Sequence, residues 1–284
     1  MQEEQLSSVP QPTPPRKHSL KRVLLIVTAI LMCAAVAVGI WVETQDSAMD
    51  NALGLKNIQP DWSSLKTNGS TKSYNDAKTH VTARLGVDVS VHQGNIDWKK
   101  LKAQGVKFAM VRLGFRGYQT GQLALDKNFK KNVEGAKDAG LDVGVYFFSQ
   151  AVNEAEAQEE AVYVLQHIQG LKINYPVVFD QEAYAADKTR TDHLTGRQAT
   201  ANCNAFCNAV QKGGYLPMVY TNSDWATQMY DVKTLRNHLI WYADYRKSPA
   251  LTNGFAMWQY TARGKLAGVG STYIDMDLLF FPKT

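Results

Sequence analysis

Residues 177–182 read Val-Val-Phe-Asp-Gln-Glu, a short apolar run that leads into two carboxylates. The apolar run predicts a buried strand. Side chains alternate between the two faces of a strand, so Asp180 and Glu182 point the same way, about 7 Å apart. Two like charges at the end of a buried strand are unfavourable, because each disfavours the ionised form of the other. A costly carboxylate pair of this kind indicates a functional site.

The sequence on either side of this strand repeats a strand–helix pattern. We expect strands at 85–91, 106–114, 142–149, 176–182, 216–222, 238–245, 255–260 and 273–281. Amphipathic helices are expected between the earlier strands, at 97–105, 125–140, 153–170 and 195–214. Repeated strand–helix units predict a parallel sheet covered by helices. Eight strands in about 200 residues favour an α/β fold with a closed, TIM-like barrel, in which catalytic residues gather at the C-terminal ends of the strands.

The N-terminal part of the chain has a different composition. Residues 1–22 are polar and Pro-rich, which predicts a disordered cytoplasmic tail. Residues 23–42 carry no charge and match the length of a transmembrane helix. Basic residues precede this segment and acidic residues follow it, so the positive-inside rule places the rest of the chain outside the cytoplasm, in the periplasm or the cell wall. We expect 43–82 to be a stalk and 83–284 to be the catalytic barrel.

A signal peptide is the alternative interpretation of the same apolar segment. Ala35-Val36-Ala37 resembles a cleavage site, and cleavage near Ala37 would release a secreted protein. The apolar run continues past this site to Val42, which favours an uncleaved anchor that holds the protein at the cytoplasmic membrane.

Composition argues against several classes of function. The net charge is +5, and no element combines Lys and Arg with interleaved aromatic residues, so no nucleic-acid partner is expected. The six histidines show neither an HExxH motif nor paired spacing, so we expect no metal. The sequence has no phosphate-binding Gly loop and no GxSxG motif, and we expect no cofactor. Cys203 and Cys207 lie four residues apart in a helical pattern, where two buried thiols are favoured over a disulfide.

Polar and aromatic side chains gather near the C-terminal ends of the expected strands. They are Asp88, Ser90, His92, Tyr146, Phe148, Asp180, Glu182, Tyr220, Asn222, Trp241, Asp244, Trp258, Gln259, Asp275 and Asp277. If the barrel closes, the inward-facing members converge on one acidic bowl that is lined with aromatic rings. Such rings stack on the apolar faces of sugars, and a carboxylic acid can protonate a glycosidic oxygen. The sequence therefore predicts a site for a sugar chain.

Several short motifs follow one another in an order that resembles glycoside hydrolase family 25, the Chalaropsis-type lysozymes or N-acetylmuramidases. They include Asp88-Val-Ser-Val-His-Gln-Gly94, Asp180-Gln-Glu182, Trp241-Tyr-Ala-Asp-Tyr245, Met257-Trp-Gln-Tyr260 and Ile274-Asp275. The resemblance covers about residues 84–284. It implies a modified (β/α)5(β)3 barrel. It also implies cleavage of the β-1,4 bond between N-acetylmuramic acid and N-acetylglucosamine in the glycan strands of peptidoglycan.

The same resemblance implies roles for the acids. Glu182 looks like the proton donor, and Asp88 and Asp275 match two further acids of the family. Asp180 would orient or stabilise the acetamido group of the substrate, or act directly as base or nucleophile. We favour the substrate-assisted route, in which the N-acetyl oxygen attacks the anomeric carbon. Asp277 stands where the resemblance leads us to expect Asn, and we assign it no role.

Substrate contacts are expected from seven further members of the set, which are Tyr146, Tyr220, Asn222, Trp241, Asp244, Trp258 and Gln259. His92 is expected to pack or to form a hydrogen bond near the bowl. The expected function is cell-wall remodelling or lysis. The alternatives are a peptidoglycan-binding module without activity and a scaffold subunit of a membrane machine. The presence of all four acids favours the enzyme, and the sequence predicts no particular protein partner.

Overall fold

The computed structural model describes residues 60–283, apart from 184–187, 232–234, 236–237 and 252–253. The expected tail and anchor, and residues 43–59 of the expected stalk, lie outside the described residues. Within the described ranges, no helix is both long enough and apolar enough to cross a membrane.

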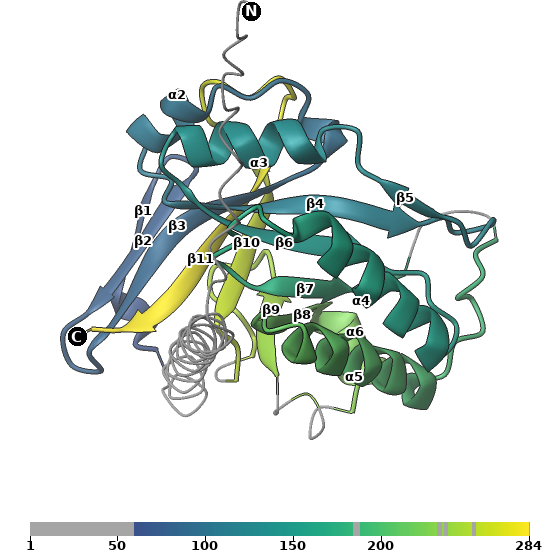
Figure 1. The fold of residues 1–284 in the computed structure, drawn as a ribbon. Helices are drawn as coiled ribbons and strands as arrows, with labels where there is room; N and C mark the ends of the chain where they lie inside the picture. The colour runs from purple at the N-terminus through teal and green to yellow at the C-terminus, as the bar shows by residue number, and fades with distance from the viewer. Residues whose placement is uncertain (1–59, 184–187, 232–234, 236–237, 252–253, 284) are drawn as a thin grey trace, which may run out of the picture. The chain divides into compact units, whose positions relative to one another are not determined.

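Eight strands close into a barrel (Figure 1). They are β3 (Val81–Val89), β4 (Phe108–Arg116), β6 (Asp142–Phe148), β7 (Val177–Asp180), β8 (Pro217–Asn222), β9 (Leu239–Ala243), β10 (Met257–Gly264) and β11 (Ile274–Pro282). Hydrogen bonds join them in the order β3-β11-β10-β9-β8-β7-β6-β4, and the pairing of β3 with β4 completes the ring. The expected closed barrel is confirmed.

Each of the first five barrel strands is followed by a helix. These helices are α2 (Trp98–Ala103), α3 (Phe129–Asp138), α4 (Glu154–Ile168), α5 (Gly196–Lys212) and α6 (Ser223–Gln228). N-cap side chains stabilise the first turns of two of these helices. Asn153 accepts a hydrogen bond from the Glu156 N–H at 3.0 Å at the start of α4, and Thr195 accepts one from the Gln198 N–H at the start of α5. Among the described residues, no helix separates β9, β10 and β11, so the arrangement is (β/α)5(β)3.

The last strand runs against its neighbours. β11 is antiparallel to both β10 and β3, whereas β3, β4, β6, β7, β8, β9 and β10 pair in parallel wherever they adjoin one another. The start of β11 therefore lies at the end of the barrel where the other strands finish. In this register Asp275 pairs with Asp88.

Alternation of side chains along the strands builds two separate apolar clusters. One cluster lies between the barrel and its covering elements and includes Val87, Val89 and Trp258. The other fills the barrel interior and includes Met110, Val178, Met218, Trp241 and Met257. Residues that alternate with the outer cluster therefore face the interior.

The structure corrects the expected stalk in its described part. A short 3-10 helix η2 (Trp62–Ser64) leads into a hairpin of β1 (Leu65–Asn68) and β2 (Thr71–Asp76), and β2 pairs with β3. The Trp62 ring stacks on Phe255 with centroids 6.4 Å apart and meets three further rings edge-on. These residues belong to the fold because they bury aromatic surface against the barrel.

One further short strand extends the sheet. β5 (Leu123–Leu125) pairs antiparallel with the end of β4, where a helix was expected to begin, and α3 starts only at Phe129. α5 carries Cys203 and Cys207 as buried, free thiols, as expected.

Candidate active site

A cavity of about 320 Å³ opens at the end of the barrel where Asp88 and Asp275 pair. It is lined by Asp88, Ser90, His92, Gln93, Arg112, Tyr146, Phe148, Asp180, Glu182, Tyr220, Trp241, Tyr245, Gln259 and Asp275. The structure thus brings together the four acids that the sequence singled out, although they come from β3, from β7 and the residues just after it, and from β11. Asp275 reaches this end only because β11 is antiparallel.

Asp180 and Glu182 occupy one side of the cavity. Burial, and then repulsion from Glu182, raises the pKa of Asp180 well above its usual range, although the positive charge of Arg112 opposes this shift. Burial raises the pKa of Glu182 to about 7, and Asp275 adds to the shift. A carboxyl group with this pKa holds a proton near neutral pH and can donate it.

Asn222 contacts Glu182, but it does not line the cavity, contrary to expectation. Its Nδ2 donates to Glu182 Oε2 at 3.3 Å, which lowers the pKa of Glu182 against the larger effect of burial. Its Oδ1 accepts hydrogen bonds from the N–H groups of Asp224 and Trp225, so the same side chain caps α6. Asn222 is therefore placed to hold Glu182 rather than a sugar.

Asp88 on β3 and Asp275 and Asp277 on β11 form a second group of acids. Burial raises the pKa of Asp275 to about 6, and burial together with repulsion from Asp275 and Asp277 raises that of Asp88 well above its usual range. Gln259 Nε2 donates to Asp88 Oδ2 at 2.8 Å and opposes this shift. Asp277 lies beneath the pair and is fully buried.

Aromatic side chains form much of the remaining wall. The Trp241 ring meets Tyr146 and Tyr220 edge-on, with centroids 6.0 and 5.1 Å apart. The hydroxyls of Tyr245 and Tyr220 donate to Gln259 Oε1 at 2.8 and 3.4 Å. Tyr245 is 58% exposed, so its ring projects at the mouth of the cavity, where a sugar can stack on it.

Sequence reasoning missed three lining residues, Gln93, Arg112 and Tyr245. Arg112 alternates with the outer-facing Val111 and Leu113, so its side chain enters the barrel, where Asp126 pairs with it at 2.8 Å. Strand alternation from Val111 was a signal that could have found it. Tyr245 is the second residue after β9, and alternation from the inward-facing Trp241 and Ala243 places it, rather than Asp244, on the inner side.

Asp244 and Trp258 do not line the cavity, contrary to expectation. Asp244 pairs with Arg246 at 2.7 Å and accepts a hydrogen bond from the Ala250 N–H. Trp258 is fully buried in the outer cluster, and its Nε1 donates to the Asp244 carbonyl at 2.7 Å. Both side chains therefore support the loop after β9 from outside the barrel.

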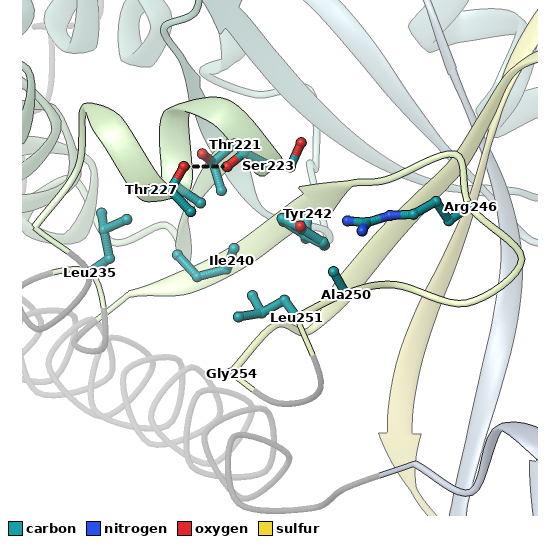
Figure 2. A pocket seen from close by; sticks show the side chains of 11 residues that line it. Thr221, Ser223, Thr227, Leu235, Ile240, Tyr242, Arg246, Ala250, Leu251 and Gly254 are labelled. Atoms are coloured by element: carbon teal, nitrogen blue, oxygen red, sulfur yellow. Dashed lines mark hydrogen bonds between the residues drawn. The ribbon is translucent and has the colours of Figure 1, made fainter.

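Figure 2 shows a different cavity, of about 370 Å³, on that outer side of β9. Ile240 and Tyr242, the outward-facing residues of β9, form its wall together with α6 residues, and Arg246 reaches its edge. Its lining contains no carboxylate. Of these two cavities, the one inside the barrel therefore contains the carboxyl groups that were predicted to be catalytic.

Comparison with known proteins agrees with this arrangement. The profile of Glycosyl hydrolases family 25 matches residues 87–269, more than half of the chain. The autolytic lysozyme of Clostridium acetobutylicum is 24% identical over 193 residues, which cover 68% of this chain and 54% of that protein. Lysozyme M1 of Streptomyces globisporus is 25% identical over 202 residues, which cover 68% and 65%.

A solved structure shows the same fold. The modular autolysin LytC from Streptococcus pneumoniae, in complex with a synthetic peptidoglycan ligand, superposes with a TM-score of 0.64 at 21% identity, covering 76% of this chain and 52% of LytC. The chain thus spans only about half to two thirds of the length of these relatives. The extended profile match nevertheless defines the family, and the chain belongs to glycosyl hydrolase family 25.

Proposed function

We propose that this chain is a peptidoglycan hydrolase, an N-acetylmuramidase that cleaves the β-1,4 bond between N-acetylmuramic acid and N-acetylglucosamine. Family membership supports a glycoside hydrolase, and the two similar lysozymes together with the LytC complex support peptidoglycan as the substrate. The cavity suits this substrate, since it combines carboxyl groups with aromatic rings that can stack on sugars.

One observation carries the proposal: Glu182 lies in a carboxylate-lined cavity with its pKa raised to about 7. Glycoside hydrolysis needs an acid that is still protonated near neutral pH, and burial supplies it here. In our proposal Glu182 protonates the glycosidic oxygen, and the leaving sugar departs with that proton.

Asp180 is proposed to act on the acetamido group rather than on the anomeric carbon. Asp180 lines the cavity beside Glu182, so its carboxyl group can accept the acetamido N–H of a bound sugar. That contact would aim the N-acetyl oxygen at the anomeric carbon, which is the substrate-assisted route. Asp88 and Asp275 lie across the cavity and would stabilise the positive charge that develops on the sugar ring.

Zymography on a gel that contains peptidoglycan tests this function. We expect the wild-type chain to clear the gel and Glu182→Gln, which keeps the shape but cannot donate the proton, to clear none. Asp138→Asn, a change at an exposed carboxylate on α3 outside the barrel, serves as the matched control and should clear as wild type does. Equal clearing by Glu182→Gln removes Glu182 from the mechanism, and no clearing by wild type favours a binding module.

We also propose that residues 23–42 anchor the enzyme in the cytoplasmic membrane, with the barrel on the outer side. The length and lack of charge of this segment support the proposal. The intact mass of the mature chain from membranes distinguishes an anchor from a signal peptide: an anchored chain retains residues 1–37, and a chain that begins just after Ala37 contradicts the anchor.

A further inference from the structure

Asp277 is the carboxyl group of the barrel interior that the proposed reaction does not use. It has no exposed surface, and it is not among the residues that line the cavity. The indole Nε1 of Trp241 donates to its Oδ1 at 2.9 Å. Its Oδ2 is buried and has no N–H or O–H donor among the described residues.

A second carboxyl group, that of Asp88, is a neighbour of Asp277. Asp277 pairs with Gly86 on β3, two residues before Asp88 and on the same inward face of that strand, and the Asp88 side chain is close enough to shift the pKa of Asp277. Two ionised carboxylates are acceptors only, so they cannot form a hydrogen bond. A single proton between them satisfies the buried oxygen and removes one of two adjacent charges.

We propose that Asp277 is a protonated, neutral carboxyl group that donates a hydrogen bond to Asp88 and acts as a positioning residue for it. Asp88 borders the cavity, where water or substrate can solvate a negative charge, whereas Asp277 does not. Asp88 also receives the Gln259 amide at 2.8 Å. With donors from Gln259 and Asp277, the Asp88 carboxylate is held in one orientation toward the cavity.

Burial, and then repulsion from Asp275, raises the pKa of Asp277 well above its usual range, whereas the Trp241 indole and the contact with Asp88 oppose this shift. β3 contributes Asp88, and β11 contributes Asp275, both of which are acids. β10 contributes Gln259 and Tyr260, and the segment that includes β9 contributes Trp241 and Tyr245. Among the described residues, no Lys or Arg is one of the groups that shift the pKa of Asp277, and burial, the largest effect, raises that pKa.

Infrared difference spectroscopy of the full chain tests the proton directly. At pH 7 the spectrum of wild type minus Asp277→Asn should contain the C=O stretching band of a protonated carboxylic acid. The matched control is Asp192→Asn, because Asp192 is exposed and hydrogen bonds from Thr189 lower its pKa. Its difference spectrum should contain carboxylate bands only. Carboxylate bands alone for Asp277→Asn would overturn the proposal.

Stability gives a second readout that is independent of catalysis. A carboxyl group that binds a proton more tightly in the folded state lowers stability as pH rises. Asn takes up no proton, so the melting temperature of Asp277→Asn relative to wild type should rise between about pH 5 and about pH 8. A difference that stays constant over this range would mean that Asp277 is ionised throughout.

The effect of Asp277 on the reaction rests on the proposed function, and the pH–rate profile tests it. The alkaline limb of Asp277→Asn should lie at the wild-type pH, because no charge is removed; a shift to lower pH would show that Asp277 is a charge that raises the pKa of Glu182. Asp277→Leu keeps the branched shape of the side chain without a donor, and should lose about ten-fold or more in kcat. If wild type does not hydrolyse peptidoglycan, the proposed function fails, while the infrared result still decides the protonation state.

Discussion

At the scale of single residues, the cavity separates its acids by environment. Glu182 is buried enough for a pKa of about 7, and it has one direct hydrogen-bond donor, Asn222. Asp180, two residues earlier, has an Oδ1 without a partner among the described residues. Differences of this kind assign the proton donor to Glu182, because a catalytic acid works best with a pKa near the operating pH.

Changing Asn222 to Asp should move the alkaline limb of the pH–rate profile upward. Asp keeps the side-chain oxygen that caps α6, but it replaces the N–H donor to Glu182 with an acceptor. Loss of the donor and gain of a nearby negative charge both raise the pKa of Glu182, so the acid stays protonated to higher pH. The pH dependence of kcat measures this shift, and a limb at unchanged or lower pH would contradict the assignment of Glu182.

At the scale of elements, strand alternation decides which side chains enter the barrel. Gly86 on β3 faces inward, between the alternating Leu85 and Val87 of the outer cluster. A Cβ atom at Gly86 would lie only 2.1–2.4 Å from atoms of the Phe108 ring, which fills the interior beside it. Glycine at this position therefore lets Phe108 pack under the acidic group.

Gly86→Ala should lower the free energy of unfolding by about 1–3 kcal/mol, the usual cost of overpacking a core. Adding Phe108→Leu, which removes the ring that the new methyl meets, should recover part of the loss. Chemical denaturation of the single and double variants measures both effects. Additive destabilisation in the double variant would mean that the two side chains do not compete for the same space.

The sequence predicts the barrel well because its signal is local. An apolar run predicts each strand, and the expected strands place the acids at positions 88, 180, 182 and 275 near the same end of the barrel. The direction of β11 has no such local signal, since strand pairing is a long-range property. Trp258 and Gln259 are adjacent, so only one of them can face inward. The residues on either side of them are largely apolar, so the sequence does not indicate that Gln259 is the one that lines the cavity. Counting alternation from Trp241 would have placed Asp244 outside.

At the scale of the whole molecule, the barrel continues into residues that composition assigns to a stalk. Residues 62–76 are polar in sequence, yet the hairpin adds to the sheet and Trp62 packs among Tyr74, Phe255, Trp258 and Phe280. A single Trp within a polar segment is too weak a periodic signal to predict a strand. Its aromatic partners lie mostly near the other end of the chain.

Trp62→Ala should destabilise the fold by roughly 2–4 kcal/mol, somewhat less than a fully buried Trp because the ring is partly exposed. Lys66→Ala, at an exposed position of the same segment, should change stability by less than about 0.5 kcal/mol. Thermal or denaturant unfolding compares the two variants. Equal, negligible effects would restore the interpretation of this segment as a stalk.

The whole molecule should also lose stability as the pH rises from about 5 to about 8. The pKa values of Glu160 and Glu182 are raised to about 7 and that of Asp275 to about 6, and burial raises those of Asp88, Asp180 and Asp277 well above their usual range. The folded state then binds more protons than the unfolded state over this range, so unfolding becomes easier as protons are withdrawn. Calorimetry should give a higher melting temperature at the acidic end; the opposite trend would contradict the raised pKa values.

The most direct test of the account is mass spectrometry of the sugars released from purified peptidoglycan. The account predicts that the wild-type chain releases fragments with N-acetylmuramic acid at the reducing end, and that Glu182→Gln releases none. Fragments that end in reducing N-acetylglucosamine, or equal release by both proteins, would contradict it.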